Sequence, residues 1–275
     1  MEESVLVESL QDGVLTLTLN RPDRLNALNP ELLDALTDSV RRAATNDQAR
    51  VVMLAGAGRG FCAGGDISGK PKSTPVSEAP SSQEAEAKPS VAERIAWLRG
   101  NMEAVRILYE MPKPTIAMIQ GPTVSVGMAL AAACDFRIVS SEATFTTGFA
   151  KVGFTGDYGA SYFLTRLLGT AKARELMLLS DQFDAVEADR IGLVSKLVLP
   201  EELEGAAYGL ARRLAKGPPL TYRFMKKNLN AAVDGRLVDV LDMEATHMVL
   251  ASMTKDQREA VKAFMEKREP VFLGK

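Results

Sequence analysis

The sequence is poor in the side chains that many enzymes use for nucleophilic or metal chemistry. Its 275 residues include one histidine and two cysteines. A single histidine excludes most Ser-His-Asp schemes and most sites with several imidazole ligands. Cys62 and Cys134 do not have the spacing of a metal motif. We therefore expect no metal, two buried thiols, and a packing role for His247 in an amphipathic helix.

The chain also lacks a strong net charge, a long apolar run and a leader pattern. Its net charge of −2 gives no broad basic field for nucleic acid. No apolar run approaches the roughly 20 residues that span a bilayer, and residues 1–4 are not followed by an apolar leader. With so few cysteines, we expect a cytoplasmic protein that binds neither nucleic acid nor membrane.

The apolar pattern predicts an α/β core over residues 1–200 and a helical region over residues 201–275. Strands at 5–10 and 14–20, a helix from Asn29-Pro30 to about Ala44, and a strand at 51–55 suggest a βαβ unit. Further elements are expected as a helix over 91–109, a strand over 115–119, a helix over 126–133, strands over 136–139 and 143–146, helices over 158–168 and 171–179, and a strand over 191–198.

Residues 68–90 differ from the rest of the core because they are rich in Pro, Ser, Glu, Ala and Lys and almost free of large apolar side chains. Such a composition predicts a long mobile loop. Because the segment directly follows a glycine-rich turn, a lid over a site and a disordered surface insertion are both open interpretations.

Two strand-to-helix turns carry the strongest chemical signal. Residues 61–66 follow the strand candidate at 51–55, and residues 119–127 follow the strand candidate at 115–119 and open a helix of small residues. Turns of this kind can aim backbone N–H groups at one point. Two such donors that converge on a carbonyl oxygen form an oxyanion hole, often the largest single contribution to catalysis.

Two segments partly match phosphate-binding motifs, but each lacks a required residue. Residues 56–61 lack the third glycine and the following helix of a dinucleotide fingerprint. Residues 64–70 have the spacing of a phosphate loop, but Pro71 stands where a magnesium-binding Ser or Thr is required. Nucleotide triphosphate binding is therefore not expected.

Taken in order along the chain, several segments resemble the signatures of the crotonase superfamily, the enoyl-CoA hydratases and isomerases. They are residues 20–28, 58–67, 112–138, 185–198 and 262–268. The resemblance implies an α/β spiral of ββα units with a C-terminal helical trimerisation region. It also implies homotrimers or hexamers, an acyl thioester of coenzyme A as ligand, and no separate cofactor.

By position, the resemblance makes Gly65 and Val126 the two N–H donors. Physical reasoning agrees, because amides at helix N-termini are unpaired and lie at the positive end of the dipole. Relatives often carry a glycine triplet where this chain has Ser125-Val126-Gly127. We expect Val126 to keep a β-region or helical backbone, which changes pocket shape but not the donor.

The resemblance also implies a set of substrate and coenzyme A contacts. The matching positions are Arg24, Ala27, Ala63, Gly64, Asp66, Ile67, Phe149, Phe264 and Lys267. Arg24 and Lys267 suit phosphate groups, although an ordinary surface cation is the alternative for each.

Hydratases of this superfamily resemble one another in two glutamates that activate water, and here those positions hold Ala129 and Phe149. One acid remains, Asp157, which precedes a predicted helix. In isomerase relatives an aspartate at the matching position moves a proton, so we expect double-bond isomerisation with Asp157 as proton shuttle. Helix capping is the alternative role for this residue.

Three other functions stay open. A hydratase could use Asp157 with water held by backbone groups, and loss of both glutamates would also suit a non-catalytic CoA-binding relative. Dehalogenation fits less well, because the only histidine lies in the helical tail and Phe149 stands where a tryptophan would be wanted. Aromatic residues could form an acyl pocket or belong to the core, so the acyl group stays undefined.

Overall fold

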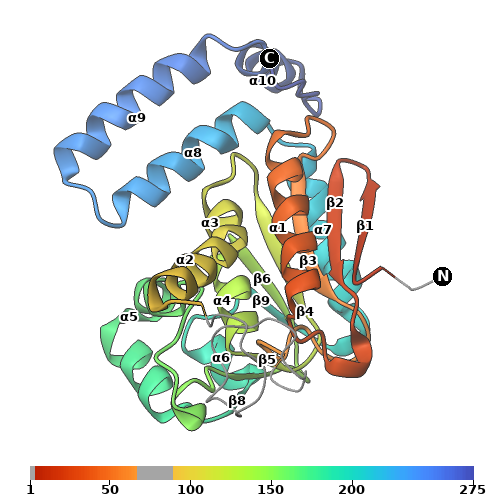
Figure 1. Ribbon diagram of the computed structural model, residues 1–275. Helices are drawn as coiled ribbons and strands as arrows, with labels where there is room; N and C mark the ends of the chain where they lie inside the picture. The colour runs from red at the N-terminus through yellow and green to blue at the C-terminus, as the bar shows by residue number, and fades with distance from the viewer. Residues whose placement is uncertain (1–3, 67–88) are drawn as a thin grey trace, which may run out of the picture.

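The computed structural model describes residues 4–66 and 89–275, so Ile67 and residues 68–88 of the loop expected over 68–90 lie outside the described residues. The first sheet has the strand order β1-β2-β3-β4-β6-β9 (Figure 1). The strands are β1 (Leu6–Gln11), β2 (Val14–Leu19), β3 (Val51–Gly56), β4 (Thr115–Ile119), β6 (Phe136–Ser140) and β9 (Lys196–Val198). β1 is antiparallel to β2, and the other neighbours are parallel. The second sheet has the order β5 (Thr123–Val124), β7 (Thr144–Thr146) and β8 (Phe183–Asp184).

Helices cover both faces of the first sheet. The helices of the described residues are α1 (Pro30–Thr45), α2 (Val91–Asn101), α3 (Glu103–Glu110), α4 (Val126–Ala133), α5 (Ala160–Leu179), α6 (Ala185–Arg190), α7 (Leu203–Ala215), α8 (Pro219–Ala232), α9 (Leu237–Ser252) and α10 (Lys255–Glu266), and not all of them lie on the sheet. Side chains alternate along β3, so that Val52 and Leu54 join the core with α1, α3 and α4, whereas Val51 and Met53 join the core with α7. This two-sided burial explains why the strand is apolar throughout.

Local capping chemistry fixes several helix starts where the sequence predicts them. The Asn29 side chain accepts from the Leu32 amide at 3.0 Å, and Pro30 is the first helical residue of α1. The strand–helix–strand order from β2 through α1 to β3 is a parallel βαβ unit, as expected. Asp184 and Thr254 cap α6 and α10 in the same way.

Three expected elements differ from the observed ones. The helix expected over residues 91–109 is divided into α2 and α3 around Met102. The strand expected over residues 191–198 is limited to β9, because Ile191 still closes α6 and Gly192 adopts a φ of 85°. α5 begins at Ala160 rather than at residue 158, and Gly169, with φ 78° and ψ 163°, interrupts its helical geometry as the glycine suggested.

The C-terminal helices fall into two groups. α7 lies beyond residue 200 but packs on the sheet, where Ala207 and Ala211 are fully buried. α8, α9 and α10 instead extend from one end of the core, as Figure 1 shows in blue. The helical region thus contains one helix of the core and three that project from it.

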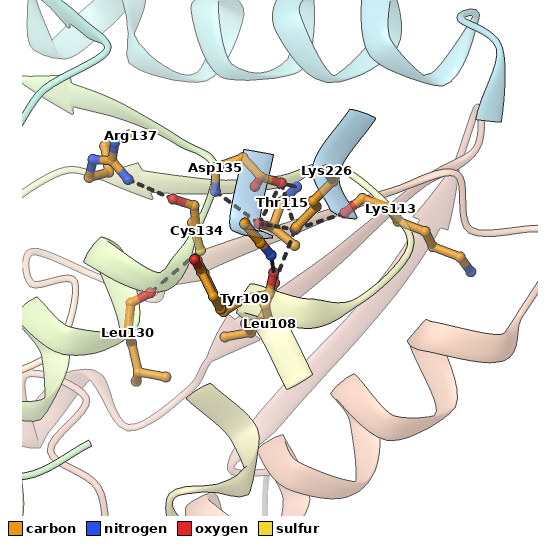
Figure 2. A network of polar contacts seen from close by, with 10 residues as sticks. Leu108, Tyr109, Lys113, Thr115, Leu130, Cys134, Asp135, Arg137 and Lys226 are labelled. Carbon is orange, nitrogen blue, oxygen red and sulfur yellow. Dashed lines mark hydrogen bonds and ion pairs between the residues drawn. The ribbon is translucent and has the colours of Figure 1, made fainter. Parts of the chain in front are cut away.

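A polar network attaches α8 to the core (Figure 2). Lys226 Nζ donates to Asp135 Oδ2 at 2.7 Å and to the carbonyl oxygens of Leu108 and Lys113 at 3.2 and 3.1 Å. Thr115 donates to the same carboxylate from its amide at 2.8 Å and from its hydroxyl at 3.0 Å. Each segment of this junction therefore forms a hydrogen bond with a charged side chain. Such charge-assisted hydrogen bonds are among the stronger ones in proteins.

Candidate active site

The first and second signature segments lie side by side. The Leu28 amide donates to the Gly64 carbonyl at 2.7 Å, and the Asp66 amide donates back to the Leu28 carbonyl at 2.9 Å. The Ala63 amide adds a bond to the Leu25 carbonyl at 2.9 Å. Ala27, Ala63, Gly64 and Asp66 are thus brought together by short backbone pairing between segments that are distant in sequence.

The second and third segments also meet. Cys62 forms an isolated parallel bridge with Thr123, and the Val124 amide donates to the Cys62 carbonyl at 2.9 Å. Glycine permits the close approach, because a Cβ added to Gly127 would lie 2.4 Å from the Cys62 carbonyl oxygen. The two glycine-bearing turns predicted from the sequence are therefore neighbours.

Each of these turns presents an amide that is free to bind a ligand. Within residues 4–66 and 89–275, neither the Gly65 nor the Val126 N–H donates to a backbone acceptor. Val126 is the first residue of α4, where the helix leaves amides unpaired and its dipole favours negative charge. Around Gly65, the space that a side chain would occupy is open. Amides without a backbone acceptor are one of the properties that oxyanion-hole donors require.

The residue between β5 and α4 has the unusual backbone. Val126 is helical, as expected, but Ser125 has φ 53° and ψ −116°. Glycine adopts this region freely, whereas a residue with a Cβ is strained there. Replacement of a glycine triplet by Ser125-Val126-Gly127 therefore strains the backbone at Ser125. Val126 is not strained, because it occupies an ordinary helical position.

Asp157 does not cap the helix that follows it. The N-cap of α5 is Gly159, with φ 78°, and α5 has no side-chain capping bond. Oδ1 of Asp157 is buried and has no hydrogen-bond partner among the described residues. Burial raises the pKa of this carboxyl to about 6. The capping role considered for Asp157 is therefore wrong, and its carboxylate is left available for chemistry.

The segment around Asp157 lies near the second signature segment. The next residue, Tyr158, is buried, and its pKa is raised mainly by burial and further by its neighbours Asp157 and Cys62. Cys62 in turn contacts Gly127 at the start of α4, and α4 packs against α5. The segment that carries Asp157 therefore lies on the same side of the core as Cys62 and the start of α4.

Phe149 forms an apolar wall beside the same segment. Its side chain is buried, and a Cβ added to Gly156 would lie 3.4 Å from its ring. Ala129, at the other position where hydratases carry a glutamate, is fully buried in α4. Neither residue can transfer a proton, so Asp157 is the acid that the described site offers.

Arg21 is a site residue that the sequence reasoning missed. It pairs with Asp66 at 2.9 Å and donates to the Ala27 carbonyl at 2.5 Å. Arg21 lies within the first signature, directly before the short turn Pro22–Arg24 that contains the predicted contact Arg24. Arg21 holds the first and second signatures together through a charge-assisted bond.

Two predicted contacts are not brought to this site within one chain. Phe264 is 82% exposed on α10, and Lys267 ends that helix with φ 54°. Figure 1 shows α10 beyond α8 and α9, well apart from α4 and β5. Ile67, also predicted as a contact, lies outside the described residues.

Other reactive side chains take no part in the site. Burial raises the pKa of both the Cys62 and the Cys134 thiol to about 12, so each is a neutral group. His247 bonds Asn228 and stacks on Phe224, which is the expected packing role. Among the described residues there is no His, Cys, Asp and Glu cluster suited to a metal, and no helix long and apolar enough to cross a membrane.

Comparison with known proteins identifies the family of the chain. Residues 9–275 match the family described as enoyl-CoA hydratase/isomerase. The chain belongs to this family, and thus to the crotonase superfamily. It is 36% identical to the 1,2-epoxyphenylacetyl-CoA isomerase of Escherichia coli K12, covering 98% of each chain. It is 31% identical to the crotonyl-CoA hydratase of Syntrophomonas wolfei, covering 99% of each.

Solved structures support the same assignment. An enoyl-CoA hydratase subunit from Geobacillus kaustophilus HTA426 superimposes with a TM-score of 0.87 at 32% identity, with both chains fully covered. The expected α/β crotonase fold is therefore confirmed, and the protein is an enzyme of the crotonase family. Its relatives include both isomerases and hydratases, so membership alone does not select the reaction.

Proposed function

We propose that the protein isomerises a carbon–carbon double bond in an acyl-CoA thioester, with Asp157 as the proton shuttle. The observation that carries this proposal is the state of Asp157, whose Oδ1 is buried without a hydrogen-bond partner while burial raises its pKa to about 6. Perturbed carboxyl groups of this kind cluster at active sites.

The mechanism begins with the amides of Gly65 and Val126, which would donate hydrogen bonds to the thioester carbonyl oxygen. As a proton leaves the carbon chain, negative charge develops on that oxygen and is stabilised by the two donors and by the N-terminus of α4. Asp157 takes the proton and returns it to another carbon of the conjugated system. One carboxylate is enough for such a suprafacial shift.

The raised pKa suits this role. At neutral pH a carboxyl with a pKa of about 6 is mostly ionised, so it can accept a proton, and it is a stronger base than an ordinary aspartate. The apolar wall that includes Phe149 keeps the carboxylate poorly solvated. Water addition by two glutamates has no counterpart here, because Ala129 and Phe149 occupy those positions.

The test supplies 3-enoyl-CoA and 2-enoyl-CoA separately and follows the absorbance of the conjugated thioester. An isomerase forms conjugation from the first substrate, a hydratase consumes it in the second, and a non-catalytic binder does neither. The Asp157→Asn variant should lose about a thousandfold in kcat, because general acid–base catalysis contributes about 10²–10⁴-fold. Asp181→Asn changes an exposed aspartate and is the matched control.

Unchanged turnover in Asp157→Asn would remove Asp157 from the mechanism. Consumption of 2-enoyl-CoA without formation of conjugation from 3-enoyl-CoA would replace isomerisation by hydration. The substrate series should include aromatic and cyclic acyl groups, since the acyl group is the undefined part of the ligand.

We further propose that the chain assembles as a homotrimer or hexamer. Large apolar side chains are exposed on α9 and α10, among them Met248 at 73% and Phe264 at 82%. Because α10 lies apart from α4 and β5 within one chain, Phe264 and Lys267 would contact coenzyme A bound to a neighbouring copy. Light scattering on the purified protein tests the assembly, and a monomeric mass at micromolar concentration would contradict it.

A further inference from the structure

Ser125 occupies a strained position at the centre of the candidate site. It is the single residue between β5 and α4, with φ 53° and ψ −116°. Such a backbone is strained for a residue with a Cβ, whereas glycine adopts it freely. The chain therefore has a serine at a position where the backbone conformation favours glycine.

The Ser125 hydroxyl is not used by the fold. Within the described residues it makes no hydrogen bond, and it does not cap α4 although it precedes that helix. Its side chain lies against the other turn, since a Cβ on Gly64 would be 3.0 Å from Ser125 Cβ and 3.5 Å from Oγ. The hydroxyl is thus placed between the turns that carry the Gly65 and Val126 amides.

A strand, a strained serine and a helix form a known backbone arrangement. In nucleophile elbows this turn exposes the serine hydroxyl, and the N–H of the following residue helps to form the oxyanion hole beside it. Here the following residue is Val126. A carbonyl oxygen bound by the Val126 amide would therefore lie beside Ser125 Oγ.

We propose that the Ser125 hydroxyl donates a third hydrogen bond to the thioester carbonyl oxygen, beside the amides of Gly65 and Val126. The proposal rests on the proposed acyl thioester ligand of this site. It makes Ser125 a substrate-contacting residue that strengthens the stabilisation of the enolate oxygen. The strain at position 125 then has a chemical reason, because a glycine could not supply this donor.

The surroundings favour a donor over a nucleophile. A serine nucleophile needs an adjacent base to take its proton, and the sole histidine of the sequence, His247, is bonded to Asn228 and stacked on Phe224 between α8 and α9. Cys62, which contacts the same turns, is a neutral thiol because burial raises its pKa to about 12. The hydroxyl proton therefore stays on Ser125 and is available for donation.

The experiment measures the bound carbonyl directly. Butyryl-CoA labelled with ¹³C at the carbonyl carbon is bound to the wild type and to Ser125→Ala, Ser125→Gly and Ser125→Thr, and the carbonyl stretch is recorded by difference infrared spectroscopy. We expect a shift to lower frequency in the wild type, an equal partial loss of that shift in the Ala and Gly variants, and partial rescue in the Thr variant. A thioether analogue without the carbonyl should bind all four proteins equally.

Kinetics provide a second readout. With the substrate turned over by the wild type, Ser125→Ala and Ser125→Gly should each lower kcat by about tenfold with little change in KM, because the bond strengthens as charge develops. Equal losses in the two variants distinguish the hydroxyl from the strain, since only glycine relieves the strain.

Several results would overturn the proposal. One is a carbonyl frequency that is unchanged in Ser125→Ala. Another is a Ser125→Gly variant that keeps the wild-type frequency while Ser125→Ala loses it. Release of free coenzyme A thiol that disappears with Ser125 would show a nucleophile instead. A shifted carbonyl in a wild type that isomerises nothing would refute the proposed reaction alone, whereas failure of the wild type to bind butyryl-CoA would refute both.

Discussion

Asp135 and Asp157 have the same side chain, but their carboxyl groups differ in hydrogen bonding. Asp135 accepts hydrogen bonds from the Thr115 amide, the Thr115 hydroxyl and Lys226 Nζ (Figure 2). Asp157 has a buried Oδ1 with no partner among the described residues, and burial raises its pKa to about 6. Both acids lie near the end of a helix, Asp135 after α4 and Asp157 before α5.

The difference separates a structural acid from a chemical one. A partly buried carboxylate that accepts several hydrogen bonds joins parts of the fold, and here Oδ2 of Asp135 joins α8 to β4. A buried carboxylate without hydrogen-bond partners joins no elements of the fold. Its raised pKa makes it a stronger base than an ordinary aspartate. Sequence alone gives both residues the same appearance, because each is an aspartate beside an apolar helix.

The largest expected effect comes from removal of Lys226, the cationic partner of Asp135. Lys226→Met should lower the free energy of unfolding by about 3 kcal/mol, because it leaves a partly buried carboxylate without its cation. Urea denaturation measures the loss, and Lys227→Met, which changes an exposed neighbour, is the matched control. Equal stability of both variants would show that the network in Figure 2 contributes little.

The second test uses pH. If Asp157 acts as the base, kcat/KM should fall about tenfold per pH unit below 6 and level off above it, because the ionised form is the active one. A pH–rate profile between pH 4.5 and 8 measures this dependence. A profile that stays flat between about pH 5 and 7 would contradict both the pKa and the assignment.

The third test compares stabilities. The pKa of Asp157 is higher in the folded protein than its ordinary value of 3.8, so its contribution is fully favourable below about pH 4 and is lost as pH rises through about 6. Asp157→Asn should therefore be more stable than the wild type at pH 7, by about 1 kcal/mol. The gap should close as the pH falls to 4. A gap that widens on acidification would reverse the sign of the assigned shift.

The smallest expected effect is at Ser125. Relief of backbone strain in Ser125→Gly is partly offset by the greater freedom of glycine in the unfolded chain, so we expect a gain below about 1 kcal/mol. Ser125→Ala retains the strain and should show no gain. Thermal unfolding of the two variants side by side measures the difference, and a more stable Ala variant would argue against strain.

Much of the architecture was predictable because local and long-range signals agree. Asn29 and Pro30 announce the start of α1, and the apolar run at residues 51–55 matches β3. The glycine-rich turns were identified from their positions after strands. The pairing of Cys62 with Thr123 between these turns has no signal in the local sequence, so it follows only from the family resemblance.

The remaining features depend on tertiary structure that leaves no local mark. The positive φ of Ser125 follows from the meeting of β5 and α4, and serine gives no sign of it as glycine would. The burial of Asp157 depends on the packing around Phe149 and Tyr158. The division of the expected helix at Met102 is different, because Gly100 and Asn101 directly before it are poor helix formers and give a local signal.

The glycines at the meeting of the turns also guide redesign of the enzyme. A Cβ at Gly121 would lie 1.9 Å from the Arg59 carbonyl oxygen, and one at Gly127 would lie 2.4 Å from that of Cys62. A mutant library that varies these positions would consist mainly of misfolded members. Randomising Val126, which has ordinary helical geometry, while keeping Ser125 and both glycines would instead vary the pocket shape on an intact scaffold.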